Sequence, residues 1–367
     1  MNNIPKLLTS LSGEKITTKE MWENFRRKEI INLFSEYVYG VRDIEKPEKL
    51  YFEKEGETEV FGMRKRDIKC GFNDFSFTFS LYLPKTQDKP LPVFVYPYIE
   101  SHERNYILNE KGNFVHKEYS DHCVPVKDIT DRGFAIALMP TKGVYRDWEE
   151  HAEYKHGVFN AVKNPKGRQS NSWATISAWA WGLSRVIDYL ETDSDIDIKH
   201  VSAVGQSRGG KTALWTGAND NRVELTVSNN SGCMGAAILR GKQGEHVKDI
   251  NCTDWFCENF RAYNDREEML PVDQHMLLAS IAPRYLYVTS SSNDTWSDPN
   301  NEFLACQMAN EAYELYGLKG AVVPDGKPKL DTAYTDGHIA YHNKTGEHSI
   351  TYYDWNRFMD YFEKIMG

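Results

Sequence analysis

Apolar and polar positions change their spacing along this chain. Residues 19–40 carry apolar side chains at helical spacing, which predicts an amphipathic helix. Its apolar side consists of Trp22, Phe25, Ile30, Leu33 and Phe34. Residues 75–83 place Phe or Leu at every second position, a period of two that predicts a strand. We therefore expect an N-terminal helix and an antiparallel hairpin region over about residues 1–90.

From residue 92 onward, short apolar runs alternate with helical stretches. The runs span residues 92–98, 134–139, 201–205, 225–227 and 285–289, and the helical stretches span 172–191, 300–317 and 351–366. Parallel strands show this continuous apolar pattern because helices cover both faces of their sheet. We expect one α/β domain over residues 1–367, a three-layer sandwich with a mostly parallel central sheet and the hairpin region packed onto it. Two long polar segments, 99–133 and 140–170, are expected to be binding loops.

Composition and charge narrow the class of protein. Hydrophobic residues make up 40% and charged residues 26%, as in ordinary soluble globular proteins. No apolar run reaches the roughly 18 residues that a membrane span needs, so we expect no membrane association. A net charge of −9 without a basic block argues against a nucleic-acid partner. The N-terminal stretch lacks the basic and apolar regions of a secretory signal, which predicts a cytoplasmic location.

The cysteine and aromatic content says less about the class of protein. The six cysteines are Cys70, Cys123, Cys233, Cys252, Cys257 and Cys306. No pair has C-x-x-C spacing, which argues against a zinc ribbon. We expect buried free thiols, and a disulfide within the group Cys233, Cys252 and Cys257 stays open. The chain holds 9 Trp and 21 Tyr, rings that can also stack on the apolar faces of sugars.

A candidate nucleophile lies in the pattern G-x-S-x-G at Gly205–Gly209, with Ser207 at its centre. The stretch 200–205 before it predicts a strand, and 208–218 after it predicts a helix. This context is what places a serine on a tight, strained turn in the α/β-hydrolase fold. The alternative is an ordinary serine at a helix N-cap.

Two cations begin the helix after Ser207. Arg208 and Lys211 sit where the helix dipole disfavours positive charge, which costs about 0.3–1 kcal/mol each. The pattern indicates that these side chains face something negative, such as an oxyanion or a carboxylate-derived group of a substrate. Otherwise both would point into solvent.

The general base is expected late in the chain, because this fold orders its triad as serine, acid and histidine. His348 lies directly before the predicted final helix and fits best, with His338 and His342 as alternatives. The three histidines do not complete a metal-site pattern, so we expect no metal and no organic cofactor. The oligomeric state is not indicated by the sequence.

The acid is expected after a late strand. The strand at 285–289 leads to Asp294, which would hold the imidazole in the correct tautomer. A turn or helix-capping role is the alternative for Asp294, and Asp298 is its nearest competitor.

Several long stretches follow one another in order from about residue 172 to the C-terminus. They are TISAWAWGLSRVIDYLETDSDIDIKHVSAVGQSRGGKTALW, SNNSGCMGAAILRGKQGEHVKDI, DWFCENF, LPVDQHMLLASIAPRYLYV, NDTWSDP and GEHSITYYDW. In these stretches the chain resembles a known family, the bacterial glucuronoyl esterases of carbohydrate esterase family 15, and the resemblance is weaker before residue 172. It implies an α/β-hydrolase that cleaves esters between 4-O-methyl-glucuronic acid on xylan and lignin alcohols.

Carried over position by position, the resemblance implies Ser207 as nucleophile, His348 as base and Arg208 as oxyanion-stabilising cation. It further implies that Lys211, Glu245 and Trp296 contact the uronate sugar; a solvated Glu245 and a core-packed Trp296 are the alternatives.

The sequence departs from the family pattern at one catalytic position. Asn230 occupies the place where fungal and some bacterial members carry the catalytic Glu, and Asp294 resembles the alternative acid of many bacterial members. We therefore expect a serine esterase acting through an acyl-enzyme on a small or oligosaccharide uronate ester. An acetylxylan or other small-ester esterase, or a catalytically weak carbohydrate-binding relative, remain as alternatives.

Overall fold

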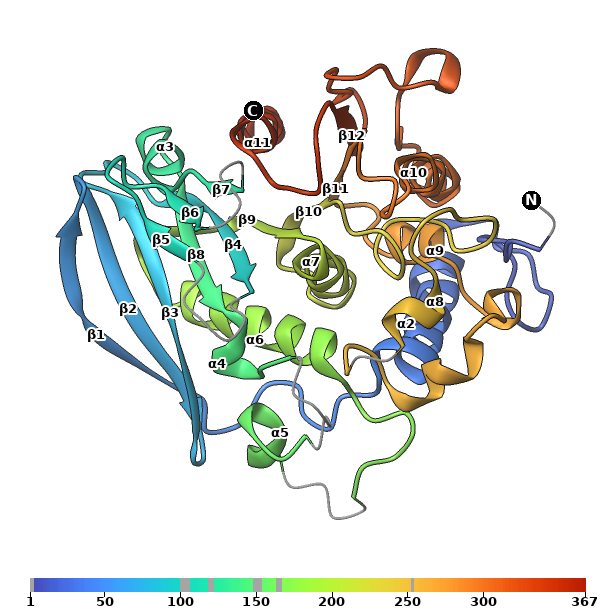
Figure 1. Ribbon diagram of the computed structural model, residues 1–367, viewed down its shortest axis with the longest axis horizontal. Coiled ribbons are helices and arrows are strands. Elements are labelled where there is room, and N and C mark those ends of the chain that lie inside the picture. The colour runs from blue at the N-terminus through green and yellow to red at the C-terminus, as the bar shows by residue number, and fades with distance from the viewer. Residues whose placement is uncertain (1–2, 100–105, 118–121, 148–153, 163–166, 252–253) are drawn as a thin grey trace.

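The computed structural model describes residues 3–99, 106–117, 122–147, 154–162, 167–251 and 254–367. Within these ranges, nine strands form one central sheet in the order β1-β2-β3-β8-β4-β9-β10-β11-β12 (Figure 1). The sheet strands are β1 (Tyr51–Val60), β2 (Met63–Phe72), β3 (Phe75–Pro84), β4 (Leu91–Tyr98), β8 (Ala135–Pro140), β9 (Ile196–Gln206), β10 (Val223–Asn229), β11 (Tyr285–Ser291) and β12 (Ile339–Lys344). The neighbouring strands β8, β4, β9, β10, β11 and β12 pair in parallel, and β1, β2 and β3 extend the sheet as antiparallel neighbours.

Helices cover both faces of the sheet, as Figure 1 shows. They are α3 (Val126–Asp131) and α11 (Tyr352–Met366) on one face, and α6 (Thr175–Leu190), α7 (Arg208–Asn219) and α10 (Pro299–Glu314) on the other. Alternate residues of β4 serve the two cores: Val93 and Val95 pack toward α6 and α7, whereas Phe94 and Tyr96 pack toward α3 and α11. Successive strand side chains point to opposite faces, so a strand that is apolar throughout is buried on both. The expected three-layer α/β-hydrolase architecture is confirmed.

The strand β12 is the main element that the hydrophobic pattern did not predict. Its sequence, Ile-Ala-Tyr-His-Asn-Lys, ends in polar residues rather than in an apolar run. His342 and Lys344 are nevertheless buried, because Asp354 of α11 accepts a hydrogen bond from His342 and forms an ion pair with Lys344. Long-range pairing therefore hides polar groups that sequence periodicity assigns to the surface.

The N-terminal helix forms as expected but alternates between α and π turns. It consists of α1 (Lys19–Met21), a π turn at Trp22–Arg26, α2 (Arg27–Phe34) and a second π turn at Ser35–Tyr39. Of its predicted apolar side, Trp22, Ile30, Leu33 and Phe34 are buried, whereas Phe25 is exposed.

The two long segments expected to be loops contain short elements where the structure describes them. In the first are a small sheet of β5 (Tyr106–Leu108), β6 (Phe114–His116) and β7 (Cys123–Val124), followed by α3. In the second are α4 (Thr141–Val144) and α5 (Gly157–Ala161). Two further short helices, α8 (Val247–Ile250) and α9 (Gln274–Ala279), lie between β10 and β11 in the chain.

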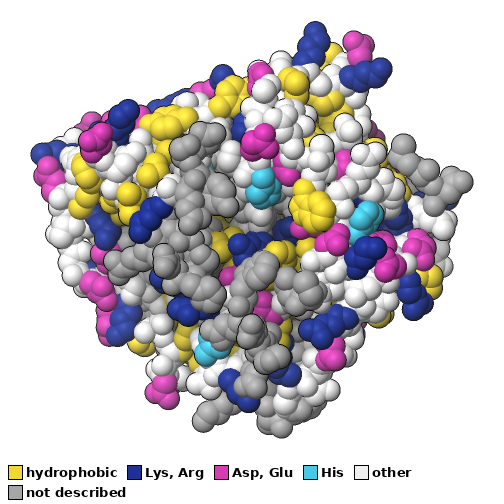
Figure 2. Space-filling view, in the orientation of Figure 1, with side chains coloured by type: hydrophobic (Ala, Val, Ile, Leu, Met, Phe, Trp, Pro, Cys, Tyr) yellow, Lys and Arg dark blue, Asp and Glu magenta, His cyan; other side chains and the backbone are white. Residues whose placement is uncertain are grey.

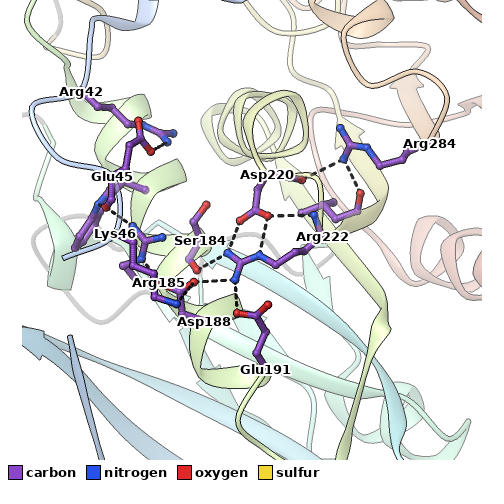
Figure 3. A network of polar contacts seen from close by, with 12 residues as sticks. Arg42, Glu45, Lys46, Ser184, Arg185, Asp188, Glu191, Asp220, Arg222 and Arg284 are labelled. Carbon is purple, nitrogen blue, oxygen red and sulfur yellow. Dashed lines mark hydrogen bonds and ion pairs between the residues drawn. The ribbon is translucent and has the colours of Figure 1, made fainter. Parts of the chain in front are cut away.

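A network of charged side chains ties α6 to the turn between α7 and β10 (Figure 3). Arg222 donates hydrogen bonds to Asp188 and Glu191 at 2.7 Å and to Asp220 at 2.7 and 2.9 Å. Arg185 donates to the other oxygen of Asp188 at 2.6 Å. Because partners satisfy the charges of Asp188 and Asp220, these carboxylates can be buried at the edge of the core.

Five cysteines, Cys70, Cys123, Cys233, Cys257 and Cys306, are buried free thiols, so Cys233 and Cys257 form no disulfide with each other. Cys252 lies outside the described residues. Among the residues that the structure describes, no helix is long and apolar enough to cross a membrane.

Candidate active site

Ser207 lies on a sharp turn between β9 and α7, at the carboxyl edge of the parallel strands. Its backbone has φ 57° and ψ −121°, a conformation that a side-chain-bearing residue adopts only under constraint. The Ser207 N–H donates to the Asn229 carbonyl at 2.9 Å, which ties the turn to the end of β10. The serine side chain makes no capping hydrogen bond, so the reading as an ordinary N-cap is wrong.

The glycines of the motif allow this turn. A Cβ on Gly205 would lie 1.9 Å from the carbonyl oxygen of Gly209, and nothing but hydrogen fits there. The strand and the helix can approach this closely only with glycine at position 205. The geometry has the strand, turn and helix that the motif requires to present a serine for nucleophilic attack.

His348 and Asp294 come together at the same edge of the sheet. Asp294 follows β11, His348 precedes α11, and the His348 Nδ1–H donates to Asp294 Oδ2 at 2.6 Å. Burial disfavours the Asp294 anion, but the hydrogen bond and charge of His348 outweigh it and hold the pKa of Asp294 well below its usual value. The His348 side chain is 43% exposed, and its imidazole faces a fixed carboxylate on the Nδ1 side.

Asn230 contacts the same carboxylate. Its Nδ2 donates to Asp294 Oδ2 at 2.8 Å, and the Ser297 N–H donates to Oδ1 at 3.2 Å. A neutral amide at position 230 stabilises the Asp294 anion, whereas a second carboxylate there would repel it. The structure thus gives Asn230 a place in the site: it is a hydrogen-bond partner of Asp294, the residue that the sequence predicts as the acid.

The competing residues have other contacts. Asp298 caps α10 by accepting from the Asn301 N–H at 3.2 Å and also accepts from the Gln243 N–H at 2.8 Å. His342 is buried and bonded to Asp354, and the His338 ring stacks on Tyr285 at 4.5 Å, at the opposite end of β12 from His348.

Arg208 points to Asp147 and does not extend freely into solvent. Its Nη1 donates to Asp147 Oδ2, and its guanidinium lies 5.2 Å from the centre of the Trp255 ring. Burial raises the pKa of Asp147, although the charge and hydrogen bond of Arg208 oppose that rise. The sequence analysis did not single out Asp147 and Trp255, which lie 61 and 47 positions from Arg208. Asp147 belongs to no motif, and Trp255 lies in the stretch DWFCENF, which carries no sign of a contact with Arg208.

Lys211, Glu245 and Trp296 form a connected group, although α7 supplies only the first. Lys211 is buried, and its Nζ donates to the Ser231 carbonyl at 2.7 Å and lies 3.8 Å from Glu245 Oε2. Trp296 Nε1 donates to Glu245 Oε1 at 3.2 Å, and 53% of the Trp296 surface is exposed. The core-packed reading of Trp296 is therefore wrong, and the negative group that Lys211 faces belongs to the protein itself.

Backbone contacts hold the loops of this group against each other. The Glu245 N–H donates to the Trp296 carbonyl at 3.0 Å, and the buried Lys242 donates to the same oxygen at 2.9 Å. A Cβ on Gly244 would lie 2.6 Å from Trp296 Cα, so this close approach requires glycine. Figure 2 shows one face of the molecule, on which histidine, acidic, basic and hydrophobic side chains meet around a recess near the middle.

Known proteins are similar to this chain in sequence and in fold. A family model described as glucuronyl esterase, fungi, matches residues 131–317. The carbohydrate esterase MZ0003 of an unknown prokaryotic organism is 32% identical over 390 residues, covering 99% of this chain and 89% of that protein. The 4-O-methyl-glucuronoyl methylesterase of Hypocrea jecorina is 28% identical and covers 85% of this chain and 62% of its own length.

Solved structures agree. The glucuronoyl esterase from Solibacter usitatus superposes with a TM-score of 0.89 at 31% identity, covering 100% of this chain and 99% of that chain. The similarity extends over the whole sheet and includes the strands on which the candidate site is built. This chain belongs to the glucuronoyl esterases of carbohydrate esterase family 15, and it is a serine-type hydrolase of carboxylic esters with the α/β-hydrolase fold.

Proposed function

We propose that this protein hydrolyses esters of 4-O-methyl-glucuronic acid, attacking the uronate carbonyl with Ser207. The observation that carries the proposal is the hydrogen bond from His348 to Asp294, formed at the same carboxyl edge of the parallel strands at which Ser207 is held in a strained turn. A fixed carboxylate on Nδ1 orients the imidazole so that its other nitrogen, Nε2, accepts the serine proton.

The reaction then proceeds through an acyl-enzyme. Ser207 Oγ attacks C6 of the uronate while His348 takes its proton. The oxyanion is stabilised by the backbone N–H of Arg208 and by the Arg208 guanidinium, which Asp147 orients. His348 returns the proton to the leaving alkoxide, and a water molecule, activated by the same histidine, releases the uronic acid. Asp294 stays ionised throughout and stabilises the imidazolium.

The sugar is recognised by the group formed by Lys211, Glu245 and Trp296. Glu245 lies 3.8 Å from the Lys211 ammonium, and its carboxylate oxygens can accept hydrogen bonds from sugar hydroxyls. The exposed Trp296 ring offers an apolar face for stacking on the pyranose. An acetyl group would have no use for this cluster, which favours a uronate ester over an acetyl ester. The substrate class includes small uronate esters and uronate-bearing oligosaccharides.

Side-by-side assays with benzyl glucuronate and p-nitrophenyl acetate test the proposal, with Ser207→Ala as the inactive control. Wild type should prefer the uronate ester. Glu245→Gln and Trp296→Ala should each raise KM for benzyl glucuronate and leave acetate hydrolysis within about twofold of wild type. Serine-dependent cleavage of acetate alone would keep the nucleophile but refute the substrate.

A further inference from the structure

Lys344 is a buried cation that the proposed mechanism does not use. It ends β12, is 4% exposed, and pairs with Asp354 Oδ2 at 3.0 Å. Its Nζ also donates to Ser291 Oγ at 2.8 Å and to the Ser349 carbonyl at 2.7 Å. Lysine is rarely buried to this extent without a specific set of partners. These three partners lead toward both members of the acid–base pair.

A chain of hydrogen bonds runs from Lys344 to the acid. Ser291 Oγ donates to Asn230 Oδ1 at 3.2 Å, and Asn230 Nδ2 donates to Asp294 Oδ2 at 2.8 Å. Asp294 Oδ2 is the same oxygen that accepts from His348 Nδ1. Lys344 is thus three hydrogen bonds from the catalytic carboxylate.

Lys344 fixes the donor-to-acceptor direction of this chain of hydrogen bonds. An ammonium group has only donors, so Ser291 must accept from Lys344 and has its single proton left for Asn230. That proton selects Oδ1 of the Asn230 amide, which turns Nδ2 toward Asp294. Without the cation, the hydroxyl of Ser291 can reverse and the amide can flip. A flipped amide would place Oδ1 against the Asp294 carboxylate and repel it.

A second contact leads to the base. The Ser349 carbonyl that accepts from Lys344 belongs to the residue directly after His348. Asp354, the anion of the ion pair, also accepts from the Thr351 N–H and hydroxyl at 2.7 and 2.8 Å and so caps α11. The loop carrying His348 is therefore anchored between Lys344 and the start of α11.

Asp354, the ion-pair partner of Lys344, has further partners in the protein interior. His342 Nε2–H donates to Asp354 Oδ1 at 2.8 Å, and the Tyr287 hydroxyl donates to His342 Nδ1 at 3.0 Å. Asp354 is buried, which opposes ionisation, but the His342 hydrogen bond and the Lys344 charge hold its pKa below the usual value. The lysine thus has a permanent counter-ion on the side away from the catalytic residues.

We propose that Lys344 is a positioning residue of the esterase: it sets the direction of the Ser291–Asn230 chain that holds Asp294, and it anchors the loop that holds His348. The inference rests on the proposed roles of Asp294 and His348.

Proton NMR reads the positioning without any substrate. The His348 Nδ1–H bonded to Asp294 should give a far-downfield resonance, identified by its loss in Asp294→Asn. This resonance should shift upfield or broaden in Ser291→Ala and in Lys344→Met. Arg185→Met removes an equally buried cation that bonds Asp188 in a separate network on α6 (Figure 3), and should leave the resonance in place. An unchanged resonance in folded Ser291→Ala and Lys344→Met overturns the proposal.

Kinetics give the second readout. On whichever ester wild type turns over, Lys344→Met should lower kcat about tenfold or more with KM within about twofold, since small misplacements of catalytic groups act on kcat. Lys344→Arg should recover part of the loss. Ser291→Ala should cost little in a Lys344→Met background, because the two residues act in one chain. Additive losses of kcat in the double variant would refute the hydrogen-bond chain from Lys344 through Ser291. If Lys344→Met does not fold, the kcat and the resonance of Ser291→Ala decide whether the proposal holds. Failure of wild type to cleave uronate esters would refute the proposed substrate and leave both readouts standing.

Discussion

Asp294 and His348 are 54 positions apart in the chain, yet the His348 Nδ1–H donates a 2.6 Å hydrogen bond to Asp294 Oδ2. The strands β11 and β12 cause this proximity, since they pair in parallel and both deliver their following loops to one edge of the sheet. Asp294, the acid that we propose, therefore lies in the loop after β11, and Asn230, after β10, donates a hydrogen bond to it.

Asp294→Asn tests that assignment. The amide keeps the size of the side chain but favours the wrong tautomer of His348, so kcat should fall about 10³–10⁴-fold. Asp298→Asn is the matched control, because Asp298 caps α10 and should affect thermal stability more than kcat. Equal losses of kcat in the two variants would contradict the assignment of the acid.

Arg208→Ala should lower kcat about 10²-fold or more, because an oriented donor to the oxyanion is lost. Asp147→Asn leaves the cation in place but weakens its orientation, so its kcat should lie between that variant and wild type. Steady-state kinetics on a uronate ester measure both. An unchanged kcat in Arg208→Ala would remove this residue from the mechanism.

Glu302 should make the stability of the protein depend on pH. Burial raises the pKa of Glu302 to about 7 from an ordinary value of 4.5, against hydrogen bonds from Ser290 and the Gly232 N–H that favour the anion. The folded state therefore holds this proton more tightly than the unfolded chain. The resulting stability is fully present below the unfolded pKa and is lost as pH rises through the folded pKa.

Glu302→Gln cannot lose that proton. Relative to the variant, wild type should therefore lose unfolding free energy as pH rises from about 5 to about 8. Urea unfolding across this range, with both proteins in the same buffers, measures the difference. Parallel pH profiles for the two proteins would show that Glu302 does not titrate there.

Arg222→Ala should destabilise the fold by about 3 kcal/mol, because it takes the bidentate guanidinium partner from the buried Asp220 and one of two arginine partners from the buried Asp188. Lys46→Ala is the control: Lys46 is exposed and pairs with the same Asp188 at 3.4 Å, so its loss should cost less than about 1 kcal/mol. Urea unfolding measures both. Similar small losses in the two variants would mean that the network in Figure 3 adds little stability.

Local patterns predicted the elements on which the site is built. Apolar runs located the parallel strands β4, β8, β9, β10 and β11, and the spacing of Gly205, Ser207 and Gly209 predicted the turn that the structure contains. These features depend on residues that are neighbours in the chain, where strand burial and close backbone approach leave a direct trace in the sequence.

Features that depend on distant pairing left no such trace. Asp147 contacts Arg208 from a polar segment without a motif, and Lys344 looks like a surface residue until Asp354 and Ser291 are placed around it. The same reason hid β12, whose polar end is buried only because α11 supplies a counter-ion. Burial of a charge is decided by partners that periodicity cannot identify.

The most direct test of the account is a rapid-quench reaction of enzyme with excess benzyl glucuronate, followed by intact-mass measurement and peptide mapping. The account predicts a transient mass increase equal to one glucuronoyl group, located on Ser207 and absent from Ser207→Ala. Turnover of the ester by Ser207→Ala at the wild-type rate, or an adduct on another residue, would contradict it.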